Sequence, residues 1–98
     1  MTIDPVLKNE VKKIVFKYID PKGVKVFIFG SRASGKNRKF SDIDLGIQSQ
    51  DEIPVTTKMD LEEGFDQSDI PYKVDIVDFS KVADNFRKAA MQNVIYLN

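Results

Sequence analysis

A single stretch decides the fold of this chain: residues 24–47, VKVFIFGSRASGKNRKFSDIDLGI. Its opening is β-branched and aromatic apart from one lysine, which predicts a strand over residues 24–29. Residues 30–41 are polar and basic with two glycines, which indicates a loop or a short helical turn. Aspartate then alternates with isoleucine and leucine, so we expect a second, half-buried strand over residues 42–47.

A first helix is expected before this stretch, over residues 5–19. Asp4 is a suitable N-cap, and Pro5 suits the first helical position because its fixed φ is already helical. Apolar residues recur at helical spacing in this segment, with lysine and glutamate between them: Leu7, Val11, Ile14, Val15, Tyr18 and Ile19. They predict the face that packs on the core.

The remaining elements are expected after the stretch. The patterns predict a helix over residues 56–65 with Met59, Leu61 and Phe65 as its apolar residues, a strand over 73–79, a closing helix over 80–92 with Ser80 as its N-cap, and a short strand over 94–97. This order predicts an α/β or α+β fold with helices packed on one sheet face. A right-handed crossover would make the second and third strands parallel.

The amino-acid composition excludes several kinds of catalytic and metal site. The 98 residues suffice for one compact domain, residues 1–98. The absence of cysteine and histidine excludes disulfides, thiolate or imidazole metal sites and Ser-His-Asp triads, so carboxylates and metals must carry any catalysis. The 15 basic residues balance the 15 acidic ones, so nothing attracts the whole molecule to nucleic acid or membrane. Because the sequence shows neither a signal-peptide pattern nor an apolar run long enough to span a membrane, we expect a soluble cytoplasmic protein.

The second expected strand carries an acid pair. Because side chains alternate along a strand, Asp42 and Asp44 share one face, and the other face is expected to pack on the core through Ile43, Leu45 and Ile47. Two like charges on one face raise each other's pKa unless a cation lies between them. A hard divalent ion such as Mg²⁺ resolves that repulsion. Taken alone, an Asp-x-Asp pattern is more typical of a solvent-exposed strand face.

The Gly30-Ser31 pair lies where the first strand ends, a position that favours phosphate binding. Backbone N–H groups are free at such a turn, glycine allows close approach, and the Ser31 hydroxyl can donate. An ordinary strand-ending turn with Ser31 as N-cap is compatible with the same role. A basic cluster follows before Asp42: Arg32, Lys36, Arg38 and Lys39. It is either a solvated loop or positive charge placed between the phosphate turn and the acid pair.

A third carboxylate is expected on the strand over residues 73–79. Asp75 lies near its start, as the acid pair lies near the start of the second strand, and neighbouring parallel strands are about 4.8 Å apart. Asp78 has the opposite parity and falls at the strand end, which is typical of a turn or cap acid. Parity therefore favours Asp75 over Asp78 as the third metal ligand.

The spacing of these motifs resembles a known family. Gly30-Ser31, ten further residues and then Asp-Ile-Asp are similar to the signature of the DNA polymerase β-like nucleotidyltransferase superfamily. Wider fingerprints resemble its minimal members, the MNT proteins, over residues 5–97: FGSRASG at 29–35, SDIDL at 41–45 and DIPYKVDIVDF at 69–79. Ser34 departs from the pattern because many relatives carry arginine there, and Arg38 or Lys39 would have to supply that charge.

The resemblance implies a nucleotidyltransferase fold, with a mixed sheet and helices packed on one face. It also implies roles for the matched motif residues. The triphosphate is expected at Gly30 and Ser31, with Arg32 and Lys36 offsetting charge as pyrophosphate leaves. Two Mg²⁺ ions are expected at the carboxylates of Asp42, Asp44 and Asp75, which are also the expected catalytic residues.

The resemblance further implies an activity and a partner. MNT proteins are commonly paired with a HEPN-type RNase toxin and act as its antitoxin, in well-understood examples by transferring AMP from ATP to a tyrosine of the toxin. A different class of function stays open, in which the chain is a non-catalytic module that neutralises a HEPN partner by masking it. The retained acids argue against pure masking. Direct nucleic-acid binding is disfavoured, because Phe16, Tyr18, Phe27, Phe29, Phe65, Phe79 and Phe86 are expected in the core.

Overall fold

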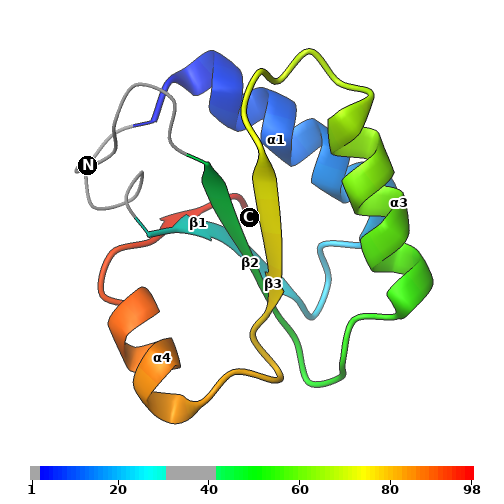
Figure 1. Ribbon diagram of the computed structural model, residues 1–98. Coiled ribbons are helices and arrows are strands. Elements are labelled where there is room, and N and C mark those ends of the chain that lie inside the picture. Colours follow the sequence, from blue (N-terminus) through cyan, green and yellow to red (C-terminus); the bar gives the residue numbers. More distant parts are fainter. Residues whose placement is uncertain (1–2, 31–41) are drawn as a thin grey trace.

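The computed structural model describes residues 3–30 and 42–98 (Figure 1). In chain order the elements are α1 (Pro5–Tyr18), β1 (Lys25–Phe29), β2 (Ile43–Gln48), α3 (Val55–Asp66), β3 (Val74–Asp78), α4 (Asp84–Ala90) and β4 (Ile95–Tyr96). The predicted elements are confirmed to within a residue or two, apart from the closing helix. As expected, the Asp4 side chain caps α1 by accepting from the Val6 N–H at 2.9 Å.

The closing helix starts later than predicted, and Ser80 is not its N-cap. The N-cap of α4 is Ala83. The Ser80 N–H and hydroxyl donate instead to the Asp78 carboxylate, at 2.9 and 2.6 Å. Ser80 therefore closes a turn after β3, and the residues between this turn and Ala83 are not helical.

The strands form one mixed sheet in the order β3-β2-β1-β4. β2 and β3 are parallel, as predicted, whereas β1 is antiparallel to both of its neighbours, β2 and β4. The chain end completes the outer side of β1: the Leu97 N–H donates to the Val26 carbonyl at 2.8 Å, and the Asn98 side chain accepts from the Val26 N–H at 3.0 Å.

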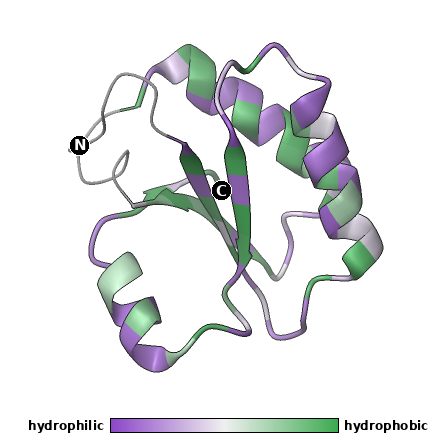
Figure 2. Ribbon diagram, viewed as in Figure 1, coloured by the Kyte–Doolittle hydropathy of each residue, from purple (hydrophilic) through white to green (hydrophobic). Residues whose placement is uncertain are grey.

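The main core lies between the sheet and the two long helices, α1 and α3, which pack side by side (Figure 1). Its fully or almost fully buried residues come from both helices, the three longer strands and the segment after β4: Val11, Val15, Val26, Ile28, Ile43, Leu45, Ile47, Leu61, Phe65, Ile76 and Leu97. Figure 2 shows hydrophobic residues concentrated on the strands, whereas hydrophobic and hydrophilic residues alternate along the helices. None of the helices in the described ranges could cross a bilayer, since even α1 has only 14 residues.

The predicted apolar face of α3 was wrong at one position. Leu61 and Phe65, four residues apart, are buried, but Met59 is 61% exposed. A spacing of two residues turns a helix by about 200°, so Met59 points away from the side that carries Leu61.

The opposite face of the sheet carries a smaller, aromatic core under the short helix α4. Phe27 and Phe79 lie with ring centroids 4.9 Å apart, and Phe29 lies 5.1 Å from Phe79. Ala90 and Met91, at the end of α4, pack against these rings. The two long helices therefore share one face, as expected, and α4 adds a partial cover to the other.

Two aromatic residues that we expected in the core are partly exposed. Tyr18 is 38% exposed and Phe86 is 44% exposed. Phe86 lies on α4 and packs against the aromatic core with one side of its ring, at 6.1 Å from Phe29 and 5.9 Å from Phe79. Both residues are at the margin of a core, where a helix meets solvent.

Candidate active site

Sheet register brings two acids and one aromatic side chain into a row. Asp44 is paired with Asp75 of β3 on one side and with Phe29 of β1 on the other. All three lie on the face opposite the main core, because their strand neighbours Ile28, Leu45 and Ile76 are buried in that core. The structure thus brings the predicted third carboxylate, Asp75, beside Asp44 of the predicted pair. Asp42 lies just before β2 and is exposed.

The negative charges of the row favour the binding of a cation. Burial, then the charge of Asp75 and then that of Asp42 raise the pKa of Asp44. Within residues 3–30 and 42–98, the Lys73 ammonium lies 3.6 Å from an Asp75 carboxylate oxygen, but its side chain is 72% exposed and it offsets that charge only weakly. Among the described residues, the surroundings of Asp44 therefore disfavour its charged form.

The acids fit an Mg²⁺ ion that shares its ligands with a substrate. Over residues 3–30 and 42–98, no three carboxylates gather closely enough to form a metal site by themselves. Mg²⁺ usually takes only one or two carboxylates and completes its shell with water and substrate phosphates. Asp44 with Asp75 meets that requirement, and Asp42 lies two residues before Asp44.

Gly30 brings the end of β1 against the Asp44 carboxylate. Its φ is +77°, a conformation that favours glycine, and a Cβ at this position would overlap an Asp44 carboxylate oxygen. Glycine at this position therefore lets the backbone lie directly against the acid row, and close backbone approach is what a phosphate-binding turn uses. The other predicted phosphate ligands, Ser31, Arg32 and Lys36, lie outside the described residues and stay predictions.

A pocket of about 550 Å³ opens over the acid row. Besides Asp44 and Asp75 it is lined by residues to which we had assigned no role, among them Lys58, Glu62, Lys73 and Phe86. Lys73 shares the parity of Asp75 two residues later, a signal that was available in the sequence. Lys58 and Glu62 come from α3, and only the packing of that helix beside β3 brings them here.

Comparison with known proteins identifies the family of this chain. The model of the polymerase beta nucleotidyltransferase family matches residues 8–98, almost the entire chain. The chain belongs to this family. Over 63 residues, this nucleotidyltransferase domain is 40% identical to a protein of Haemophilus influenzae named as a probable protein adenylyltransferase, MntA. That match covers 64% of this chain and 55% of the relative, so the chain spans little more than half the length of the curated protein that it matches.

Solved structures share the nucleotidyltransferase fold. A chain of a toxin–antitoxin crystallised with AMP-PNP superposes with a TM-score of 0.74 and 23% identity, covering 93% of this chain and 72% of that one. A chain from the complex of a tri-AMPylated Shewanella oneidensis HEPN toxin with an MNT antitoxin gives a TM-score of 0.70 and 20% identity, covering 95% and 70%. At these identities the likeness establishes the fold.

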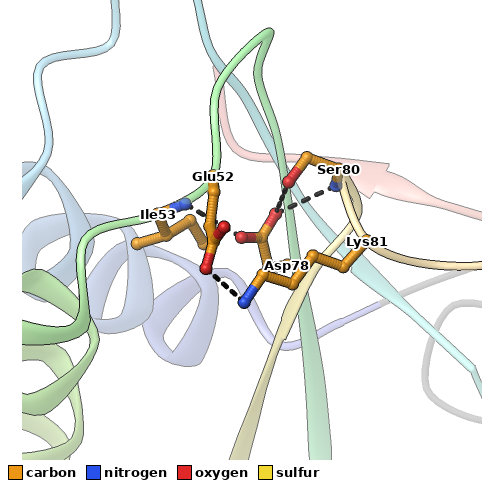
Figure 3. A network of polar contacts seen from close by, with 5 residues as sticks. All are labelled: Glu52, Ile53, Asp78, Ser80 and Lys81. Atoms are coloured by element: carbon orange, nitrogen blue, oxygen red, sulfur yellow. Dashed lines mark hydrogen bonds and ion pairs between the residues drawn. The ribbon is translucent and has the colours of Figure 1, made fainter.

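Asp78 of the nucleotidyltransferase domain has a separate set of partners (Figure 3). It pairs with Ile47, three residues along the ladder from Asp75. Its carboxylate accepts from the Ile53 N–H at 2.9 Å and from the Ser80 N–H and hydroxyl. Partial burial acts to raise the pKa of Asp78, but these hydrogen bonds outweigh it and lower the pKa. Asp78 thus joins the turn before α3 to the end of β3.

The Gly30 conformation leads to a paired prediction. Gly30→Ala and Gly23→Ala each place a Cβ on a backbone with positive φ, +77° and +74°, so each should lose about 1–2 kcal/mol of stability. Only the Gly30 variant drives its Cβ into Asp44, because nothing lies within 4 Å of the corresponding position at Gly23. We expect Gly30→Ala alone to lower nucleotide transfer, by about 100-fold, since small displacements of reacting groups are that costly.

Thermal melts and initial transfer rates of both variants check this prediction. Equal losses of activity in the two variants would mean that backbone strain, and not the contact with Asp44, is responsible.

Proposed function

We propose that this chain is a protein adenylyltransferase antitoxin: it transfers AMP from ATP to a hydroxyl, a tyrosine of a HEPN-type toxin, in the cytoplasm. The observation that carries the proposal is the Asp44–Asp75 pair beside the glycine turn at Gly30. Two further findings support it. The 40% identical relative is named as a probable protein adenylyltransferase, and a structural neighbour comes from a complex of an AMPylated HEPN toxin with its MNT antitoxin.

The acids and the glycine turn would bind different groups, the metal and the triphosphate respectively. Asp42, Asp44 and Asp75 would hold Mg²⁺, in a two-ion arrangement, and the triphosphate would lie along Gly30. When bound, the metal supplies Lewis-acid chemistry: it lowers the pKa of the acceptor hydroxyl and neutralises the charge of the triphosphate. The phosphate contacts would be completed by residues just beyond the turn: Ser31, Arg32 and Lys36.

The transfer itself is an in-line substitution at the α-phosphorus of ATP. The acceptor hydroxyl oxygen forms a bond to this phosphorus, the bond from the phosphorus to the bridging oxygen of the β-phosphate breaks, and pyrophosphate leaves with that electron pair. The hydroxyl proton passes to a base. Because the chain contains no histidine, the Asp75 carboxylate is our candidate for this base.

A labelling experiment tests the proposal. The protein, Mg²⁺ and a HEPN-type toxin encoded next to it are incubated with ATP labelled either at the α- or at the γ-phosphate. We expect label on the toxin from the α position only, at a tyrosine found by mass spectrometry, with release of pyrophosphate. Label from the γ position would show a kinase reaction, and no label from either would contradict the proposed activity.

Asp75 and Asp78 provide a matched pair of variants, because they lie on the same strand. Asp75→Asn should lower transfer at least about 100-fold and leave the melting temperature unchanged or higher, since it removes a charge next to Asp44. Asp78→Asn should keep transfer and lose about 1–2 kcal/mol of stability, because an amide cannot accept all of the hydrogen bonds from Ile53 and Ser80.

The pH dependence separates the two acids further. The pKa of Asp78 is lowered in the folded state, so its stabilising effect is complete above the ordinary value of 3.8 and is lost as pH falls through the folded pKa. The stability difference between wild type and Asp78→Asn should therefore shrink in that acid range. The reverse assignment of roles would follow if Asp78→Asn abolished transfer and Asp75→Asn did not.

A further inference from the structure

A second pocket, of about 360 Å³, lies beside Gly30 on the β1 side of the acid row. In the part of the chain that the structure describes, its lining residues are uncharged: Phe29, Gly30, Phe86, Ala89, Ala90 and Asn93. It shares Phe29 and Phe86 with the pocket that contains Asp44 and Asp75, so the two pockets are neighbours. A lining of this kind, which has no cation among the described residues, offers little to a phosphate group. Its apolar and aromatic lining with one amide suits a flat, neutral group instead.

Phe86 is a preorganised surface for such a group. Its ring packs edge-to-face on Phe29, at 6.1 Å and 85°, and is tilted against Phe79 at 5.9 Å. It is nevertheless 44% exposed, so part of the ring is open to a ligand. Ala89 and Ala90 on the next turn of α4 have short side chains that leave room beside it. Aromatic rings held in this way bind nucleobases by stacking.

The position of this pocket matches the order of groups in a nucleotide. Across the sheet the register places Phe29, Asp44 and Asp75 in adjacent strands, about 4.8 Å from one to the next. The base-sized pocket therefore lies at the β1 end of the row and the acids at the other, and Gly30 adjoins both, because it lines the pocket and lies against Asp44.

We propose that this pocket is the nucleobase subsite of the enzyme, with Phe86 as the stacking platform and the Asn93 amide as the group that reads the edge of the base. The inference rests on the proposed function, since it assigns a place to the base of the same nucleoside triphosphate. An amide presents both hydrogen-bond donors and an acceptor, as the edge of a base does. Phe86 thereby sets the affinity for the nucleoside, and Asn93 contributes to the choice among bases.

Binding measurements with and without a base test this assignment. Isothermal titration calorimetry compares Mg²⁺–ATP with Mg²⁺–tripolyphosphate, which carries the phosphates but no nucleoside. Phe86→Ala should weaken ATP binding about 10-fold or more and leave tripolyphosphate binding unchanged. Tyr96→Ala is the matched control, because Tyr96 is similarly exposed, at 47%, and packs on Phe27 without lining the pocket. It should change neither affinity.

Asn93→Ala should bring the affinities for ATP, GTP, CTP and UTP closer together. In the wild-type protein, nuclear magnetic resonance should show the Phe86 ring protons shifting with ATP and not with tripolyphosphate, which avoids any effect of a substitution on folding.

The outcomes separate this inference from the function on which it rests. Unchanged ATP binding in Phe86→Ala would overturn the base subsite alone. Equal losses for ATP and tripolyphosphate would also overturn it, because Phe86 would then merely support the phosphate site. If the wild-type protein bound neither ligand, the proposed nucleotide transfer would be refuted, and the base subsite would be refuted with it.

Discussion

The double variant Asp42→Asn/Asp44→Asn is expected to lose transfer of AMP and to gain thermal stability. Transfer should fall at least about 100-fold, because the metal whose ligands are removed contributes several kcal/mol to a phosphoryl transition state. The gain in stability comes from the folded protein itself. Burial, then Asp75 and Asp42, raise the pKa of Asp44, so its charged form is disfavoured in the folded state.

The pH range of this effect follows from the direction of the pKa shift. A group with a raised folded pKa stabilises the protein fully below its ordinary pKa, and this contribution is lost as pH rises through the folded value. At neutral pH the Asp44 carboxylate therefore opposes folding, and an amide relieves that opposition. Melting curves in a chelator at neutral pH should show the double variant above wild type, with a difference that shrinks in acid.

Label transfer from α-labelled ATP measures the catalytic half of the prediction. Magnesium-dependent labelling that persists in the double variant would refute the assignment of these acids. A melting temperature well below wild type would mean instead that the acids support the fold. The loss of transfer would then be explained by unfolding and not by a catalytic role of the acids.

The same double variant distinguishes catalysis from masking in cells. If modification neutralises the toxin, the variant should fail to protect cells that express the HEPN partner, although it still folds. Protection that survives without Asp42 and Asp44 would favour the non-catalytic module. Copurification of the variant with the toxin confirms that both proteins are present and in contact.

Gly46→Ala should cause the largest loss of stability from a single methyl group in this protein. Gly46 is buried in β2, under the aromatic core. A Cβ there would overlap the Phe27 ring edge and would lie 2.8 Å from the Phe79 ring. Both rings are fully buried and packed on each other, so neither can move away freely. Overpacking of this kind costs about 2–3 kcal/mol, the equivalent of roughly 10–20 °C for a domain of this size.

Gly64→Ala is the matched control. Gly64 lies in α3, where a Cβ would come within 3.1 Å of the Tyr18 ring and 3.2 Å of Ile14. Tyr18 is 38% exposed and can shift by a few tenths of an ångström. Alanine also favours a helix over glycine by about 1 kcal/mol. We therefore expect stability within about 0.5 kcal/mol of wild type or above it. Denaturant unfolding of both variants decides the matter, and a stable Gly46→Ala protein would mean that the aromatic core is loosely packed.

The alternation of residues in the strands was enough to divide the sheet into two faces. From period two alone, Ile43, Leu45 and Ile47 were expected in the core, and all three are buried. The same rule placed Asp44 on the other face and separated Asp75 from Asp78 by parity. The positions of the two long helices, α1 and α3, were equally clear from the sequence, because caps and apolar spacing act within a few residues of the chain, whereas the start of α4 was predicted wrongly.

Which residues from distant segments meet depends on tertiary packing. Register between β2 and β3 pairs Asp44 with Asp75, and no local pattern specifies that partner. The exposure of Phe86 and the hydrogen bonds that draw Ser80 to Asp78 likewise follow from how α4 and the β3 turn pack. A sequence pattern determines which side of its own element a residue faces. The neighbours across that side belong to other elements, and their identity depends on packing of the entire domain.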